Sequence, residues 1–301
     1  MDKEKKLKAK ITNGPWVFYI IAGVFAVICF LPLWITLVSS LSSESAVTLN
    51  GYSLWPQETT LETYKYIIDN KGSMLLRAFG VTFLVVVLGT VFSLVVTTCF
   101  AYVTAQRKDT FKFANALSFF AWFTTIFSGG LLPWYILTTR YYGLQNNIFA
   151  LFVPSAMSVF LMFVLKNNFR SLPVELVESA KIDGAGNMRI FVQIAIPLTK
   201  VAMVTITLFY ALQYWNDFHL SLYLITKNEL YTMQKLLYNM MANISALMSN
   251  SNMASAASSI QIPTNTARMA MTVMTIAPVL VFYPYAQKYF VKGITIGAVK
   301  G

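Results

Sequence analysis

Long apolar runs constrain this chain more than any other feature of its sequence. A helix needs roughly 20 residues to cross a hydrocarbon core of about 30 Å. Open sheet edges cannot face lipid, and the alternating strands typical of a membrane barrel are absent from the sequence. We therefore expect an all-α integral membrane protein with six transmembrane helices. They are placed near residues 16–38, 78–105, 113–139, 148–165, 201–225 and 269–286.

The composition excludes an ordinary soluble domain, a disulfide framework and a cysteine zinc site. Only 12% of the residues are charged and the mean hydropathy is +0.59, whereas an average soluble protein is about 25% charged. The chain has 2 cysteines, Cys29 and Cys99, and 1 histidine. That cysteine pair cannot build a disulfide framework or a cysteine zinc site. We therefore assign no catalytic residue and no metal-binding residue.

The basic residues follow a pattern along the chain. Most of the 23 Lys and Arg fall at the two ends and within 107–112 and 166–200. The positive-inside rule places such segments in the cytoplasm, so the net charge of +11 indicates topology rather than nucleic-acid binding. The first run is too long for a signal peptide and lacks a small-residue cleavage site, so it should remain as a helix. We expect cytoplasmic tails at 1–15 and 287–301, flanking a transmembrane domain at 16–286.

Two segments on the opposite side of the membrane are long. Residues 39–77 are expected to form short helices at the interface, and residues 227–268 are rich in Asn, Ser, Met and Ala. Loops of this length usually have a function or are disordered. The sequence leaves two alternatives for the second segment: it contacts an extracellular partner, or it does not.

The inner loop 166–200 carries the clearest local pattern. Ser171 and Pro173 indicate a helix start, and the sequence predicts a short helix over 174–183. Its apolar arc is narrow and lacks aromatic residues: it consists of Leu176, Val177 and Ala180. An amphipathic helix can rest on lipid, but a narrow arc with a small alanine favours docking into a protein cleft.

The end of this helix is also marked in the sequence. Gly184 and Gly186 are expected to end it, because glycine often follows a helix C-terminus. Asn187 is expected to cap a second short helix, which stops before Pro197. The loop is thus predicted to be a compact helix–turn–helix parallel to the membrane.

The same loop resembles a known signature. It contains Glu178-Ser179-Ala180, then Gly184, then Ile194-Ala195-Ile196-Pro197. This resembles the E-A-A, three residues, G, nine residues, I-x-L-P signature of permease subunits of binding-protein-dependent ATP-binding-cassette importers. The spacing matches throughout, with Ser179 in place of the first alanine and Ile196 in place of leucine. The resemblance implies a coupling helix that sits in a cleft of the ATPase subunit. The residues implied in coupling are Glu178, Ser179, Ala180, Gly184, Ile194 and Pro197.

Further motifs resemble the carbohydrate permeases of this family, and the end of the chain resembles the maltose-permease G type. Together they are most similar to the branch that imports complex oligosaccharides. The resemblance implies a type I importer permease fold, multi-pass in a bacterial cell membrane. The stretches are Tyr142-Gly143-Leu144-Gln145-Asn146-Asn147, Trp215-Asn216-Asp217-Phe218, Ile262-Pro263, Ala267-Arg268, 287–294 and 297–301.

The resemblance also implies partners. The phosphate-binding pattern G-x-x-x-x-G-K-[ST] is absent, so ATP and Mg²⁺ would be bound by two separate ATPase subunits, and no cofactor is expected in this chain. A second, homologous permease in a heterodimer, an extracellular solute-binding protein and an oligosaccharide substrate complete the expected set. Nucleic acid is not among the expected partners.

The fifth apolar run carries a polar and aromatic stripe. Polar groups in lipid are costly, so the stripe should face the helix bundle. Aromatic faces and hydrogen-bonding groups suit a sugar, which makes the stripe a candidate substrate pathway. Contact with the partner permease is the other interpretation. The candidates are Thr205, Phe209, Gln213 and Asn216, with Asp217 near the outer end.

Other functions are weighed against the importer. A secondary active sugar transporter usually shows repeats and broken helices, and no convincing repeat relates the two halves. A non-transporting membrane scaffold subunit would not depend on an ATPase. A membrane enzyme is disfavoured because H-E-x-x-H and G-x-S-x-G are absent and a single histidine leaves little catalytic equipment.

Overall fold

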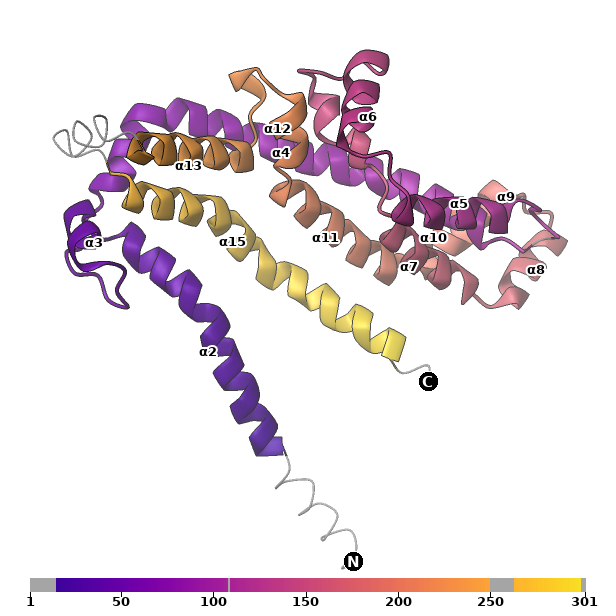
Figure 1. Ribbon diagram of the computed structural model, residues 1–301. Helices are drawn as coiled ribbons and strands as arrows, with labels where there is room; N and C mark the ends of the chain where they lie inside the picture. Colours follow the sequence, from indigo (N-terminus) through magenta and orange to yellow (C-terminus); the bar gives the residue numbers. More distant parts are fainter. Residues whose placement is uncertain (1–14, 108, 250–262, 299–301) are drawn as a thin grey trace, which may run out of the picture. The chain divides into compact units, whose positions relative to one another are not determined.

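The described part of the chain is helical. The computed structural model describes residues 15–107, 109–249 and 263–298 (Figure 1). Within those ranges there is no strand, and an isolated bridge pairs Ser42 with Thr59. The predicted all-α class agrees with these residues. The six-span count and the side on which each terminus lies stay predictions.

The chain divides into two compact units. The first combines Met1–Gly72 with Asn239–Ala277, and the second combines Ser73–Tyr238 with Pro278–Gly301. The predicted N-tail at 1–15 falls almost entirely outside the described residues, as does the end of the predicted C-tail.

The first unit contains α2 and α3 and parts of three helices that extend beyond its bounds. Ser43 starts α3, because its side chain accepts a hydrogen bond from the N–H of Ala46, and Gly51 ends it with φ +75°. The predicted short helices over 39–77 are represented by α3 and the first turns of α4. The helices are α2 (Pro15–Ser40), α3 (Glu44–Asn50), α4 (Glu62–Ala105), α13 (Met233–Ser249) and α15 (Asn265–Ala298).

Glu44 links α3 to the start of α15. Its carboxylate accepts hydrogen bonds from the Thr264 hydroxyl, the Asn265 N–H, and both the N–H and the hydroxyl of Thr266, at 2.7 to 2.9 Å. First-turn N–H groups have no partner within their own helix, so Glu44 caps α15 from another segment. Burial alone would raise the pKa of the Glu44 carboxyl, but these hydrogen bonds outweigh burial and hold the pKa below its usual value.

The second unit holds most of the remaining elements. Helices α7 and α11 lie side by side, and α8 lies beyond the end of α7 (Figure 1). Two elements are π-helical turns, η1 (Leu137–Tyr141) and η4 (Phe191–Ala195). The others are α5 (Ala114–Ile126), α6 (Leu131–Ile136), η2 (Ile148–Leu151), η3 (Val153–Ser155), α7 (Val159–Arg170), α8 (Val174–Ile182), α9 (Asn187–Ile190), α10 (Ile196–Leu198), α11 (Lys200–Asn216), α12 (His219–Leu224) and η5 (Asn228–Leu230).

Two described helices, α2 and α4, are long and apolar enough to cross a membrane alone. Three bent pairs also qualify, which gives up to 5 candidates. The first four overlap the first four predicted spans. The fifth candidate covers only residues 201–216 of the predicted span 201–225, and its first half, Asn187–Leu198, lies in the predicted inner loop. The sixth predicted span, 269–286, lies within α15 and stays a prediction. The bent pairs are Ala114–Ile126 with Leu131–Tyr141 (116°), Ile148–Ser155 with Val159–Arg170 (56°), and Asn187–Leu198 with Lys200–Asn216 (80°).

Helix α4 begins well before the predicted second span. The span was placed from residue 78, whereas the helix starts at Glu62. The intervening residues contain charges but no proline, and they favour helix as well as the apolar run does. Loss of hydrophobicity indicates where a membrane could end and does not indicate where a helix ends.

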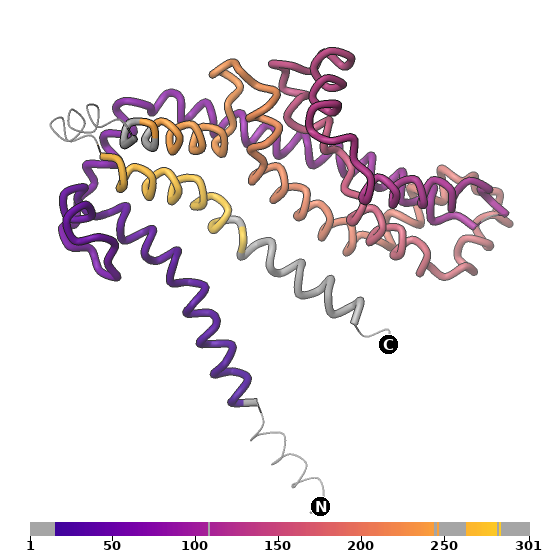
Figure 2. Tube along the Cα trace, viewed as in Figure 1, coloured from indigo at the N-terminus to yellow at the C-terminus, as the bar shows by residue number. Residues whose placement is uncertain are grey.

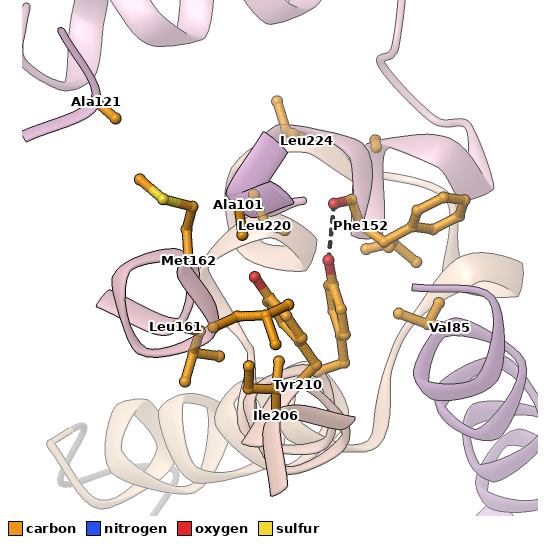
Figure 3. Close-up of a cluster of buried hydrophobic side chains, with 14 of the residues drawn as sticks. Val85, Ala101, Ala121, Phe152, Leu161, Met162, Ile206, Tyr210, Leu220 and Leu224 are labelled. Atoms are coloured by element: carbon orange, nitrogen blue, oxygen red, sulfur yellow. Dashed lines mark hydrogen bonds between the residues drawn. The ribbon is translucent and has the colours of Figure 1, made fainter. Parts of the chain in front are cut away.

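Two tyrosines of α11 organise the core of the second unit (Figure 3). The Tyr214 hydroxyl pairs with Ser93 of α4 at 2.6 Å, and the Tyr210 hydroxyl pairs with Thr97 one turn further along. Gly89 continues the same face of α4. A Cβ placed there would lie 2.9 Å from the Tyr214 ring and 2.9 Å from Phe152 Cβ. The helices approach this closely because one of them presents small residues.

The same tyrosines supply hydrogen bonds to a broken span. Between η2 and α7 the backbone leaves the regular α-helical path, and its polar groups need other partners. The Tyr214 hydroxyl donates to the Phe152 carbonyl oxygen at 3.1 Å, and the Tyr210 hydroxyl accepts from the Ser158 N–H at 3.0 Å. Both tyrosines are fully buried, so these bonds fix the bend of this span.

Candidate functional site

Helix α8 is present where the sequence predicts a helix over 174–183. It follows Pro173, whose fixed φ suits a helix start. Glu175 in its first turn and Lys181 in its last complement the helix dipole. A Schellman motif ends it: Ala185 N–H donates to the Ala180 carbonyl and Gly184 N–H to the Lys181 carbonyl. Gly184 has φ +78°, which favours glycine at this position.

This helix protrudes from the second unit. None of its residues is buried, and Ile182 is 86% exposed. Of the candidate coupling residues, Glu178, Ser179 and Gly184 are exposed, and Ala180 is half-buried. The predicted apolar arc is therefore not buried within the described chain: Leu176 is 44% exposed, and Val177 and Ala180 are half-buried.

The second half of the loop differs from the prediction. Gly186, not Asn187, is the N-cap residue, and Asn187 begins α9 without a side-chain cap. The helical path also continues through Pro197 into α10. The π-helical turn η4 precedes that proline, and a widened turn tolerates a residue that lacks an N–H. Ile194 is half-buried and Pro197 is exposed.

An aromatic cluster anchors this loop to the rest of the unit. Phe191 packs on Tyr102 of α4 with ring centroids 4.6 Å apart, and Phe169 of α7 lies 5.5 Å from the same tyrosine. Both phenylalanines belong to the loop region or its edge, so these rings connect the loop to α4 and α7. Sequence reasoning missed this cluster, although aromatic residues at the ends of apolar runs were an available signal.

Lys166 is not a loop residue. The predicted loop started there, but α7 continues to Arg170 and Lys166 is buried. Its ammonium group donates a hydrogen bond to Ser118 Oγ of α5 at 2.5 Å and lies 5.2 Å from the centre of the Phe163 ring. The side chain therefore fastens α5 to α7.

The candidate pathway stripe lies on the open face of α11. Gln213 and Asn216 are exposed, Phe209 is 40% exposed, and Thr205 is half-buried. The opposite face carries the buried side chains that form the core of the unit: Ile206, Tyr210 and Tyr214. The structure thus brings the stripe together along one side of α11 and turns it away from the chain's own core.

Asp217 has a local structural role. Its carboxylate accepts a hydrogen bond from the Leu220 N–H at 3.1 Å, in the first turn of α12. The other end of α12 is held by Lys235, whose ammonium group donates to the carbonyl oxygens of Ser221 and Ile225 at 2.9 and 2.6 Å. The W-N-D-F stretch therefore ends α11 and starts a short helix fixed at both ends.

Asn146 shows the structural role of the Y-G-L-Q-N-N stretch at residues 142–147. It has φ 57°, which asparagine tolerates better than most residues. Its side-chain oxygen accepts from the Thr226 N–H, the Thr226 hydroxyl and the Lys227 N–H at 2.7 to 3.0 Å. Its own N–H donates to the Leu224 carbonyl. This stretch therefore secures the loop that follows α12.

Comparison with known proteins places these features in a family, although no family model matches the chain. The chain is 34% identical over 278 residues to the Bacillus subtilis polygalacturonan/rhamnogalacturonan transport system permease protein YtcP, covering 92% of this chain and 95% of that protein. It is 34% identical over 281 residues to protein LplC of the same organism, covering 93% and 92%. A crystal structure of a bacterial ABC transporter involved in the import of the acidic polysaccharide alginate contains a similar chain, with a TM-score of 0.78, 28% identity and coverage of 92% and 98%.

The chain belongs to the family of permease subunits of ATP-binding-cassette importers for oligosaccharides. The family resemblance derived from the sequence is confirmed. The chain is a component of a transporter, and its homologues are membrane proteins.

Proposed function

We propose that this chain is the membrane-spanning permease subunit of an ATP-driven importer of oligosaccharides delivered by an extracellular solute-binding protein. The observation that carries this proposal is the protruding helix α8, which holds Glu178, Ser179 and Ala180 and buries none of its residues. Several apolar side chains of α8 and α9 are exposed together, among them Leu176, Ile182 and Met188, and such a group favours a protein partner. The six spans lie in the bacterial cell membrane with both termini in the cytoplasm.

Two separate ATPase subunits drive the transport in this proposal. They bind ATP and Mg²⁺, and this chain needs no cofactor of its own. Helix α8 docks in a cleft of one ATPase subunit, and Gly184, Ile194 and Pro197 set its position. Movement of α8 then reaches α4 and α7 through Phe191 and its ring contacts. Packed interfaces of this kind change between discrete arrangements.

The open face of α11 borders the substrate pathway in this proposal. A second, homologous permease faces it, and the sugar passes between the two subunits. Phe209 offers an aromatic face, and Gln213 and Asn216 offer hydrogen bonds. The alternative role of the stripe, a direct contact with the second permease, predicts that substituting these residues would impair assembly.

A secondary active sugar transporter and a non-transporting scaffold subunit are the competing functions. The first would import sugar without an ATPase, and the second would import none. Reconstitution separates them. Purified complex in proteoliposomes, with ATP enclosed, is supplied with the binding protein and a panel of oligosaccharides. The panel starts from polygalacturonan, rhamnogalacturonan and alginate fragments, the glycans in the names of the similar proteins.

The decisive variant introduces bulk into the docking helix. Ala180→Phe is expected to lower sugar-stimulated ATPase activity at least tenfold, because a small residue is needed where helix and cleft meet. Glu175→Phe is the matched control, since it adds the same ring to the same exposed helix outside the signature. Unchanged stimulation in Ala180→Phe would show that α8 does not couple, and sugar uptake without ATP would favour the secondary transporter.

A further inference from the structure

The loop that follows α3 folds back beside the end of α2 (Figure 2). Its end is tied to the residues that directly follow that helix. The Thr60 N–H donates a hydrogen bond to the Leu41 carbonyl oxygen at 2.8 Å. The Ser43 N–H donates to the Glu58 carbonyl oxygen at 3.0 Å. Residues 51–59 therefore form a closed loop with its base at the end of α2.

The tip of this loop, residues 52–55, contacts α2 itself. The Trp34 indole N–H donates to the Leu54 carbonyl oxygen at 2.9 Å. The Trp34 and Trp55 rings meet edge to face, with centroids 6.3 Å apart. Trp34 lies about 9 Å before the end of α2 at Ser40, because a helix rises 1.5 Å per residue. The tip thus reaches back along the helix instead of extending beyond it.

The contact between the tip and α2 falls at the edge of the membrane. The candidate span Trp16–Ser40 has 25 residues, which makes it about 37 Å long, and a hydrocarbon core is about 30 Å thick. The ends of α2 therefore extend into the headgroup region. A point about 9 Å from the end then lies near the boundary between headgroups and acyl chains. In the proposed topology this is the outer boundary.

The side chains at the tip are apolar or aromatic, and they are not covered by the described chain. Trp55 is 72% exposed, Tyr52 is 55% exposed and Leu54 is 49% exposed. The exposed Phe30 ring lies 6.2 Å from the Trp34 ring and extends this surface onto α2. The most apolar stretch of α2 is likewise not buried within the described chain. The tip therefore continues the apolar surface of a candidate span.

A lipid interface is the cover that fits this surface. Tryptophan and tyrosine gather where headgroups meet acyl chains, because their rings are apolar and carry a polar group. The polar side chains near the tip are paired with one another: Ser43 donates to Glu58, and Asn50 donates to Gln57, both at 2.6 Å. An extracellular protein would have to reach below the end of α2 to cover Trp55, whereas lipid is present at that depth.

We propose that Tyr52, Leu54 and Trp55 form an interfacial anchor, with their side chains among the headgroups and upper acyl chains of the outer leaflet. The anchor holds the outer end of α2 at a fixed depth through the hydrogen bond from Trp34 to Leu54. The inference rests on the proposed function for the topology alone. It assigns a lipid-contacting role to a segment outside the candidate spans.

Depth-dependent fluorescence quenching tests the anchor in the complete complex, reconstituted into vesicles of phosphatidylglycerol and phosphatidylethanolamine. Cys29→Ala and Cys99→Ala first remove the 2 natural cysteines. Trp55→Cys is then labelled with a nitrobenzoxadiazole fluorophore. Phe25→Cys, at an exposed position inside α2, is the control for the acyl chains. Glu229→Cys, at an exposed position in η5, is the control for water.

Lipid that carries a spin label near its headgroup should quench Trp55→Cys at least twofold more strongly than lipid labelled deep in its acyl chains. The order should be reversed at Phe25→Cys. Iodide in the water should quench Glu229→Cys at least threefold more strongly than Trp55→Cys. Equal iodide quenching at these two positions would place the tip in water. Weak quenching of Trp55→Cys by both lipid and iodide would mean that a protein covers it. Either result would overturn the proposal.

Tyr52→Cys repeats the measurement without removing a ring that packs on Trp34, and it decides the question if Trp55→Cys does not assemble. It should give the same order of quenching as Trp55→Cys. The measurement needs neither ATP nor sugar, so it is independent of transport. An anchored complex that imports no oligosaccharide would contradict the proposed function alone. A complex that imports oligosaccharide with the tip in water would contradict this inference alone.

Discussion

The hydroxyl of Tyr214 lies 3.1 Å from the carbonyl oxygen of Phe152 and donates a hydrogen bond to it. The two residues belong to different candidate spans, and the carbonyl lies between η2 and η3, shortly before the break in one of these spans. A buried tyrosine thus adds a second partner for a carbonyl that accepts one bond within its own span, from the Ser155 N–H at 3.3 Å. Both rings belong to one core cluster, so the bend is part of the packed interior.

Tyr214→Phe is expected to destabilise the assembled protein by about 1–3 kcal/mol, because it leaves the Phe152 carbonyl and the Ser93 hydroxyl buried without this partner. The measurement is the thermal midpoint of the purified complex in detergent. Tyr142→Phe, at an exposed position, is the control and should leave the midpoint unchanged. Equal midpoints for the two variants would show that Tyr214 acts through its ring alone.

Gly89→Ala is expected to destabilise the chain by about 1–3 kcal/mol through overpacking. The added methyl group would stand 2.9 Å from both Phe152 Cβ and the Tyr214 ring. Gly80→Ala on the same helix meets nothing within 4 Å, and the better helix propensity of alanine should leave stability equal or higher. A comparison of the two thermal midpoints checks the prediction, which fails if Gly89→Ala is as stable as Gly80→Ala.

Glu44 should make stability depend on pH. Its pKa is lowered in the folded protein, so the ionised carboxylate stabilises the fold above the unfolded pKa, and this contribution is lost as pH falls through the folded value. Glu44→Gln should lower the thermal midpoint at neutral pH and reduce the further loss on acidification. Exposed Glu229→Gln serves as the control. An acid profile unchanged by Glu44→Gln would show that its contacts to α15 do not contribute.

Sequence reasoning reached the all-α class of fold and the helix α8. Both depend on local patterns: apolar length for the spans, and Pro173 with Gly184 for α8. It did not reach the breaks within the third and fourth spans. An apolar run looks the same whether its helix is straight or bent, and a break needs hydrogen-bond partners far away in sequence, such as Tyr210 for Ser158.

The sequence predicted which residues of the candidate site share a face of α11. It did not predict which side chains around them are buried. The periodicity of α11 correctly grouped Phe209 with Gln213 on one side. It could not show that the opposite side is occupied by buried tyrosines, because tyrosine is common at membrane interfaces as well as in cores. Lys166 and Lys235 were counted as loop charges, yet both are buried. Their partners are a hydroxyl and backbone carbonyls, which leave no signature in a sequence.

Asn146 gives a final prediction, which concerns the loop after α12 that its side chain holds. Asn146→Ala removes all three hydrogen bonds accepted from Thr226 and Lys227 and disfavours the positive φ. We expect the loop after α12 to open more often, so trypsin should cleave after the exposed Lys227 at least several-fold faster in the assembled complex.

Asn146→Asp is the matched variant for this test. Aspartate tolerates the same φ and accepts the same three hydrogen bonds. It loses only the bond that the asparagine amide donates to the Thr226 hydroxyl at 2.8 Å. Its cleavage rate should therefore stay close to that of the parent. Equal acceleration in both variants would mean that the donated bond, and not the accepted ones, holds the loop.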